Sequence, residues 1–298
     1  MILKVLPPLI ILLIGYLLKK FKIFDKEAGN TMLQLVFYVA QPAAILVSVS
    51  SLKLSWDLFF LPFLPSIISL IIISISFLVA RKMHLPRKTM GSFLVGTAIM
   101  NTGFTIPFIS AVYGSEGFAK MALFDVGNAI FVFSFVYYIA ALYGSDGGNK
   151  KTLLKKLLFS APLWAITIAL ALNFTKTTID PLIIQTLQLG AYMIVPLLML
   201  SLGIYFEPKI LNFKREILAV CIRMGLGLIL GYAFATLLGL EGITKAVVII
   251  GASGPIGYNT LTFSKLEKLD EEFTANIISL SVIVAIILIP LLMYLINI

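Results

Sequence analysis

The sequence predicts an all-α integral membrane protein with ten transmembrane helices arranged as two inverted five-helix repeats. Three observations support this fold class: an apolar composition, ten apolar segments of membrane-spanning length, and an internal repeat at an offset of 154 residues. Of the 298 residues, 60% are hydrophobic and 12% are charged. Soluble domains average roughly 45–50% and about 25%, so the composition excludes an ordinary soluble domain.

Each apolar segment approaches the roughly 20 residues with which a helix crosses about 30 Å of hydrocarbon. The first segment is followed by Lys19, Lys20 and Lys22 rather than by a small-residue cleavage site. We therefore expect a retained helix and not a secretory signal. The ten segments cover residues 3–18, 32–49, 58–80, 90–113, 117–143, 158–174, 182–205, 217–238, 244–266 and 273–296.

The cations are distributed unevenly between alternate loops. Counted together with the adjoining segment ends, loops after the odd-numbered segments carry two to four Lys and Arg each, whereas loops after the even-numbered segments carry one each. The positive-inside rule places the odd loops in the cytoplasm and both termini outside the cell. The net charge of +9 therefore reports orientation in the plasma membrane, and we expect no nucleic-acid partner.

The internal repeat divides the chain into two halves. Residues 31–42, TMLQLVFYVAQP, align with residues 185–196, QTLQLGAYMIVP, with five identities in twelve positions. This predicts repeats at 1–143 and 158–298, joined by a flexible, basic cytoplasmic linker at 144–157. Because each half crosses the membrane an odd number of times, the second half must be inverted, as in many secondary transporters.

Two segments are interrupted by small, polar and proline residues at matching places in the halves. Residues 100–114 read MNTGFTIPFISAVYG and residues 251–260 read GASGPIGYNT. Proline removes a backbone donor and glycine weakens a helix by roughly 1 kcal/mol, so we predict helix breaks at Pro107 and Pro255. Backbone groups freed in hydrocarbon must be buried in protein or line a wet cavity, which predicts a polar site. The alternative is that the asparagines only bond neighbouring helices.

The candidate site residues lie around these two breaks. Half-helix amino ends present N–H groups to anions and carboxyl ends present carbonyls to cations, so a bound anion and a coupling cation both fit. One further candidate, beside Pro42 in the first half, could face the crossing point. The substrate-binding candidates are Asn101, Thr102, Gly103, Ser253, Gly254, Asn259, Thr260 and Gln41.

Two charged residues lie more than one turn from the ends of predicted segments. Asp125 is nine residues beyond Glu116, about 13 Å along a helix, and Asn128 faces nearly the same way. Intramembrane carboxylates mark ion or proton pathways, so Asp125 and Asn128 are coupling-ion candidates, although Asp125 could instead cap its helix near the surface. Arg223 lies one to two turns inside its segment, and we expect it to snorkel to the interface. The single cysteine, Cys221, offers neither a disulfide nor a metal site.

The two interrupted segments resemble those of the auxin efflux carrier family, especially its bacterial and archaeal permeases associated with malate or malonate. NTGFTIPFISAVYG (101–114) is similar to the fourth-helix pattern of Asn, Gly, aromatic and Pro ending in Tyr-Gly. Residues 255–291 are similar to the ninth and tenth helices, with an acidic connector and a Ser-rich start to the last helix. The chain departs from the pattern at Thr105, where many relatives have glycine, and at Ser264, where alanine is usual.

The resemblance implies a fold shared with bile-acid sodium symporters, in which helices 4 and 9 cross at their breaks. It implies a scaffold of helices 1, 2, 6 and 7, through which some relatives form homodimers. Helices 3–5 and 8–10 would then form a transport domain that moves in an elevator-like step.

These features predict a secondary transporter of small organic anions, such as carboxylates or auxin-like weak acids, working by alternating access in the lipid bilayer. No phosphate-binding loop, HExxH helix or GxSxG elbow is present, so we expect neither an enzyme nor a bound cofactor. The coupling ion is left open between Na⁺ and H⁺. The alternatives are a sodium-coupled, bile-acid-type symporter, and a channel or sensor that keeps the carrier fold.

Overall fold

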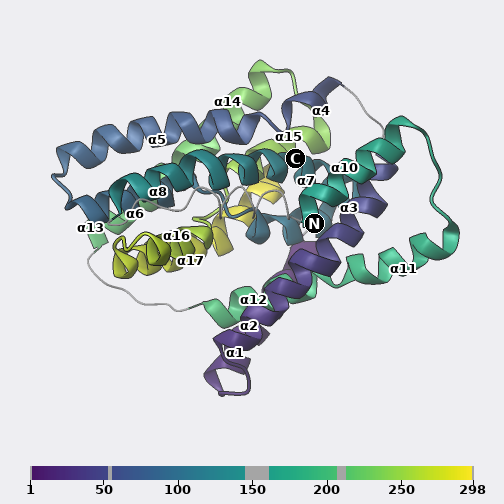
Figure 1. Cartoon of the computed structure of the whole chain (residues 1–298), viewed down its shortest axis with the longest axis horizontal. Helices are drawn as coiled ribbons and strands as arrows, with labels where there is room; N and C mark the ends of the chain where they lie inside the picture. Colours follow the sequence, from purple (N-terminus) through teal and green to yellow (C-terminus); the bar gives the residue numbers. More distant parts are fainter. Residues whose placement is uncertain (1, 53–55, 145–160, 207–212, 297–298) are drawn as a thin grey trace. The chain divides into compact units, whose positions relative to one another are not determined.

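The structure is a computed structural model that describes residues 2–52, 56–144, 161–206 and 213–296. Every regular element in these ranges is helical, and the only β pairing among them is one isolated bridge. Most of the predicted linker at 144–157 lies outside the described residues. Figure 1 shows the helices in chain order. The prediction of an all-helical protein is therefore confirmed.

Six helical stretches of the described residues are long and apolar enough to cross a membrane. One of them, from residue 102 to residue 143, is not a single straight helix. Gly114 has a non-helical φ of 63°, and the helix is kinked there. The arrangement of ten helices in inverted repeats stays a prediction. The six stretches are Lys26–Ser50, Leu64–Lys82, Thr102–Tyr143, Pro181–Tyr205, Lys214–Leu237 and Glu271–Ile296.

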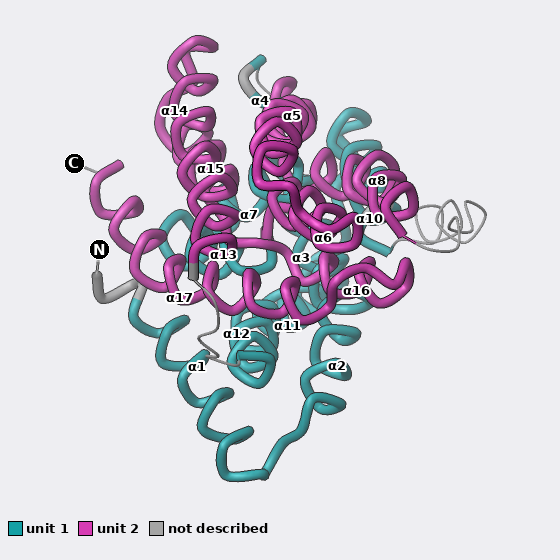
Figure 2. Tube along the Cα trace, turned by 90° about the vertical axis from the view of Figure 1, so that its left-hand side faces the viewer, with its two compact units in different colours: residues 1–58, 103–123, 158–206 teal, residues 59–102, 124–157, 207–298 magenta. Residues whose placement is uncertain are grey.

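The chain forms two compact units, drawn in teal and magenta in Figure 2. Unit 1 comprises Met1–Leu58, Gly103–Leu123 and Leu158–Phe206, and unit 2 comprises Phe59–Thr102, Phe124–Leu157 and Glu207–Ile298. Helices α4 (Trp56–Phe60) and α7 (Thr102–Phe131) contribute to both units. These units are defined by spatial contact, whereas the predicted domains 1–143, 144–157 and 158–298 are defined by the sequence repeat. The predicted boundaries therefore stay a prediction.

In unit 1, small residues allow helices to approach closely. A Cβ on Gly15 of α1 would lie 2.3 Å from the carbonyl oxygen of Leu200 in α12, and one on Gly203 would lie 2.0 Å from that of Leu12. Asn173 of α10 donates to carbonyls at the end of α3, at 2.7–3.0 Å. The other helices of unit 1 are α1 (Ile2–Lys20), α2 (Lys26–Leu35), the π-helix η1 (Val36–Ala40), α3 (Gln41–Ser50), α10 (Ala161–Phe174), α11 (Pro181–Tyr192) and α12 (Ile194–Tyr205).

In unit 2, buried apolar side chains of α5, α6, η2, α8 and α16 form a continuous core. Close packing again uses a glycine, because a Cβ on Gly127 of α7 would lie 1.7 Å from the carbonyl oxygen of Pro62. The helices of unit 2 are α5 (Leu64–Lys82), α6 (Arg87–Ala98), η2 (Val132–Val136), α8 (Tyr137–Tyr143), α13 (Phe213–Val220), η3 (Cys221–Leu226), α14 (Gly227–Leu237), α15 (Gly242–Ala252), α16 (Asn259–Leu266) and α17 (Glu271–Ile296).

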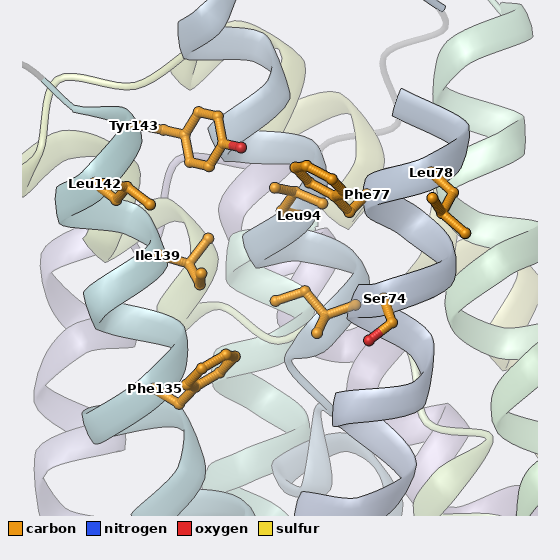
Figure 3. A pocket seen from close by; sticks show the side chains of 9 residues that line it. Ser74, Phe77, Leu78, Leu94, Phe135, Ile139, Leu142 and Tyr143 are labelled. Atoms are coloured by element: carbon orange, nitrogen blue, oxygen red, sulfur yellow. The ribbon is translucent and has the colours of Figure 1, made fainter. Parts of the chain in front are cut away.

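A cavity of about 410 Å³ opens between α5, α6 and α8 of unit 2 (Figure 3). Its lining is almost entirely aliphatic and aromatic, including Phe77, Leu94 and Phe135. Its one aliphatic hydroxyl, on Ser74, already donates to the carbonyl of Leu70 at 2.8 Å. The cavity is lined by none of the predicted site residues and offers no charged group to an anion, so its lining does not match the predicted anion site.

Candidate functional site

Two helices of unit 2 stop and restart within the segments that the sequence marks as interrupted. Helix α6 ends at Ala98 and α7 begins at Thr102, while α15 ends at Ala252 and α16 begins at Asn259. Pro255 lies inside the second interruption and cannot donate a helical hydrogen bond, so the proline contributes directly to that break.

The two interruptions pair with each other through their backbones. Met100 and Ile256 form an isolated antiparallel bridge. The N–H of Asn101 donates to the carbonyl of Pro255 at 2.9 Å, and the N–H of Gly257 donates to the carbonyl of Ile99 at 3.1 Å. These bonds satisfy backbone groups that the breaks release, which apolar surroundings require. The two interrupted segments therefore meet inside unit 2.

The predicted break at Pro107 is misplaced. Pro107 lies within α7, five residues after the first helical residue, and the interruption comes before it at residues 99–101. Pro107 lies beyond the first turn, where its missing N–H leaves the carbonyl of Gly103 without a helical donor, yet α7 continues through it. The backbone pairing around Met100, which sequence patterns do not reveal, fixes where the first break lies.

The predicted substrate residues are placed differently with respect to the paired interruptions. Asn101 and Thr102 are 6% and 7% exposed at the first interruption, and Thr260 is fully buried just after the second. The hydroxyl of Ser253 bonds back to Ile249 of its own helix at 2.6 Å, which occupies its donor. Gly254 is buried within the second break, Asn259 is exposed at the start of α16, and Gly103 follows Thr102 half-buried in α7. Gln41 lies in unit 1 at the start of α3, and its role stays a prediction.

Asp125 and Asn128 of α7 lie beside the first interruption. The hydroxyl of Thr102 donates to Oδ1 of Asp125 at 2.5 Å. The amide nitrogen of Asn128 donates to the carbonyl of Met100 at 3.2 Å and makes a longer contact of 3.4 Å with Asp125 Oδ1. Oδ1 of Asn128 is buried without a hydrogen-bond partner among the described residues, as is Oγ1 of Thr260. Carboxylate, hydroxyl and amide oxygens of this kind are ligands of hard cations.

Arg223 is part of this site although the sequence predicted otherwise. The expectation that it snorkels to the interface is wrong, because its side chain is 0% exposed. Its Nη1 donates to the carbonyls of Thr97 and Ala98 at 3.2 and 3.3 Å, and its Nη2 donates to that of Ala252 at 2.7 Å. Snorkelling was expected from depth along an ideal α-helix, whereas Arg223 lies in the π-helix η3, whose wider turn changes the side-chain direction. The part of this arrangement visible in the sequence is Gly227, where a Cβ would lie 2.8 Å from Nη2 of Arg223, but its spacing alone does not reveal the contact.

Comparison with known proteins identifies the family of the chain. A family model described as "Membrane transport protein", that of the auxin efflux carrier family, matches residues 1–293. The chain is 27% identical over 296 residues to an uncharacterized transporter of Methanothermobacter thermautotrophicus, covering 96% of this chain and 95% of the relative. It is 26% identical over 297 residues to an uncharacterized transporter of Methanocaldococcus jannaschii, covering 96% of each. The match over nearly the whole length and the apolar helices together show that this multi-pass membrane protein belongs to the auxin efflux carrier family of membrane transport proteins.

Proposed function

We propose that the protein is a secondary transporter that carries small organic anions, such as carboxylates or auxin-like weak acids, by alternating access. The observation that carries this proposal is the pairing of the two interruptions. Residue 101 bonds to residue 255 and residue 257 bonds to residue 99, so the starts of α7 and α16 both lie within a few residues of the bridge. The amino ends of α7 and α16 thus lie close together in unit 2.

The converging helix ends supply what an anion needs. The first N–H groups of a helix have no intrahelical acceptor, and each amino end carries roughly half a positive charge. Asn101 and Thr102 precede and open α7, and Asn259 and Thr260 open α16. Some of these groups are already used, because the N–H of Asn101 donates to Pro255 and the hydroxyl of Thr102 donates to Asp125. A carboxylate of a few atoms would be attracted by the two positive helix ends and would accept from the side-chain amides of Asn101 and Asn259 and the hydroxyl of Thr260. Gly103, Ser253 and Gly254 adjoin these residues in the sequence and complete the proposed set, and Gln41 of unit 1 stays a candidate from the sequence alone.

The oxygen atoms of Thr102, Asp125 and Asn128 form the proposed site for the coupling ion, Na⁺ or H⁺. A cation held there would compensate the charge of the substrate anion as both cross the apolar barrier. The second candidate function, a sodium-coupled symporter of the bile-acid type, rests on this same oxygen cluster. Replacing sodium by choline in the transport assay tests sodium coupling, because a sodium-coupled symporter must then stop whereas an H⁺-coupled carrier continues.

The organisation of the proposed carrier follows from the repeat and the family. Ten helices in two inverted repeats would form a scaffold of helices 1, 2, 6 and 7, with a transport domain of helices 3–5 and 8–10 that moves in an elevator-like step. Pairing through the scaffold would give a homodimer. The basic loops would face the cytoplasm and both termini the outside of the plasma membrane.

Counterflow in proteoliposomes tests the proposed function. Liposomes loaded with unlabelled carboxylate should accumulate the labelled compound transiently and saturably. Asn101→Ala should abolish this signal, whereas the matched control Asn30→Ala, at an exposed position of α2, should retain it. Conductance without exchange would identify a channel, and binding without flux a sensor. Either result would overturn the carrier proposal.

A further inference from the structure

We propose that the Arg223 guanidinium is a built-in cation that occupies the place between the carboxyl ends of α6 and α15, so that no metal ion binds there. This inference rests on the proposed carrier function and assigns one part of its site. Residues 97 and 98 are the last two of α6, and residue 252 is the last of α15. Arg223 donates to the carbonyls of all three.

Charge balance supports this assignment. The last four carbonyls of a helix have no intrahelical donor, and each carboxyl end carries roughly half a negative charge. Two such ends together offset about one positive charge, which is the charge of a guanidinium at neutral pH. Within the described part of the chain, every recorded hydrogen bond of Arg223 goes to a backbone carbonyl, and its Nε has no partner.

Two local features make room for the guanidinium. Arg223 lies in the π-helix η3, and Gly227 opens α14 four residues later. A Cβ on Gly227 would lie 2.8 Å from Nη2 of Arg223 and 2.0 Å from the carbonyl oxygen of Ala252. Only glycine lets the guanidinium and this carbonyl meet beside the backbone of α14. The site is therefore shaped around the arginine.

The consequence concerns ion coupling. In transporters with broken helices, the carbonyls at half-helix carboxyl ends are where coupling cations bind. Here those carbonyls already hold a cation that is covalently attached and cannot be released during the cycle. A mobile coupling ion must then bind elsewhere, and the cluster of Thr102, Asp125 and Asn128 remains as its place.

Chemical rescue tests the proposal by a readout that does not require transport. Thermal unfolding of Arg223→Ala should shift to higher temperature with millimolar guanidinium chloride, because the free ion binds the vacated carbonyls. The wild type and the control Arg81→Ala, at an exposed position of α5, should show no such shift. Counterflow should be lost in Arg223→Ala and partly restored by guanidinium. Absence of any guanidinium-dependent shift in the purified variant would overturn the proposal.

A pair of milder variants covers the case in which Arg223→Ala cannot be purified. Arg223→Lys keeps the positive charge but loses the planar arrangement of N–H donors, whereas Arg223→Gln keeps an N–H donor but loses the charge. The proposal predicts that thermal stability and counterflow are better retained by the lysine variant. The opposite order would show that hydrogen bonding alone is needed, and would overturn the role of charge. The two proposals can also fail separately. If the wild type shows no counterflow but guanidinium still raises the unfolding temperature of Arg223→Ala, the carrier function is refuted and the role of Arg223 as a built-in cation is retained.

Discussion

Replacement of Gly127 by alanine tests the close packing that positions Asp125 and Asn128 on α7. The added Cβ would lie 1.7 Å from the carbonyl oxygen of Pro62 and 2.5 Å from its carbonyl carbon. Both obstructing atoms belong to the backbone, so no rotamer change relieves the clash and the two segments must separate. Overpacking typically costs about 1–3 kcal/mol, and we expect the upper end here.

The gain in helix propensity works in the other direction and is smaller. Glycine to alanine in a helix contributes about 1 kcal/mol, which leaves a net destabilisation of about 2 kcal/mol, or more than tenfold in the unfolding equilibrium. Gly225 provides the matched control, because its added Cβ would meet no atom within 4 Å. We expect Gly225→Ala to be neutral or to raise stability by a few tenths to about 1 kcal/mol.

Thermal unfolding of the purified protein in detergent, followed by intrinsic fluorescence, measures both variants against the wild type. Gly127→Ala should unfold at a lower temperature and Gly225→Ala at an equal or higher one. Counterflow should also fall in Gly127→Ala, since Asp125 and Asn128 would be displaced with their helix. The reasoning is refuted if the two variants unfold at the same temperature.

Two further substitutions probe the site and the packing of unit 1. Thr102→Val removes the hydroxyl that donates to Asp125 at 2.5 Å, a bond to a charged group worth about 1.5–3 kcal/mol. Uptake measured over a range of Na⁺ concentration and pH should then need roughly tenfold more of the coupling cation, and an unchanged titration would exclude Asp125 from ion binding. Asn173→Ala leaves carbonyls at the end of α3 without their donor, so it should lower thermal stability by about 1–3 kcal/mol while counterflow at low temperature persists. Unaltered stability would show that water replaces the amide.

Sequence patterns predicted the helical class, the membrane location and the two interrupted segments. These signals are local. Apolar runs reveal membrane-spanning helices, and clusters of Gly, Pro and Asn reveal interruptions because glycine has a low helix propensity and proline cannot donate a backbone hydrogen bond. Pro255 accordingly lies within a break. The same reasoning placed the first break at Pro107, where α7 is in fact helical, because the pairing between residues 99–101 and 255–257 is not local.

Arg223 illustrates the second limit of prediction from one sequence. Depth along an ideal α-helix placed it within reach of the interface, whereas the side chain points to three carbonyls separated from it by 29 to 126 positions in the chain. Such contacts depend on the π-helix and on the space beside Gly227, which composition and periodicity do not encode. The polar partners of Asp125 were closer in sequence, and the prediction that Asp125 and Asn128 lie together rested on simple helical spacing.

Substrate protection of an introduced thiol tests most directly whether the paired interruptions hold the anion. Asn259→Cys places a thiol at the exposed first residue of α16, and the native Cys221, exposed in η3, serves as the internal reference. The variant must first be shown to retain counterflow. Saturating carboxylate should then slow maleimide labelling at position 259 several-fold without affecting position 221. Equal labelling at position 259 with and without a carboxylate that the variant transports would place the substrate elsewhere and contradict the account.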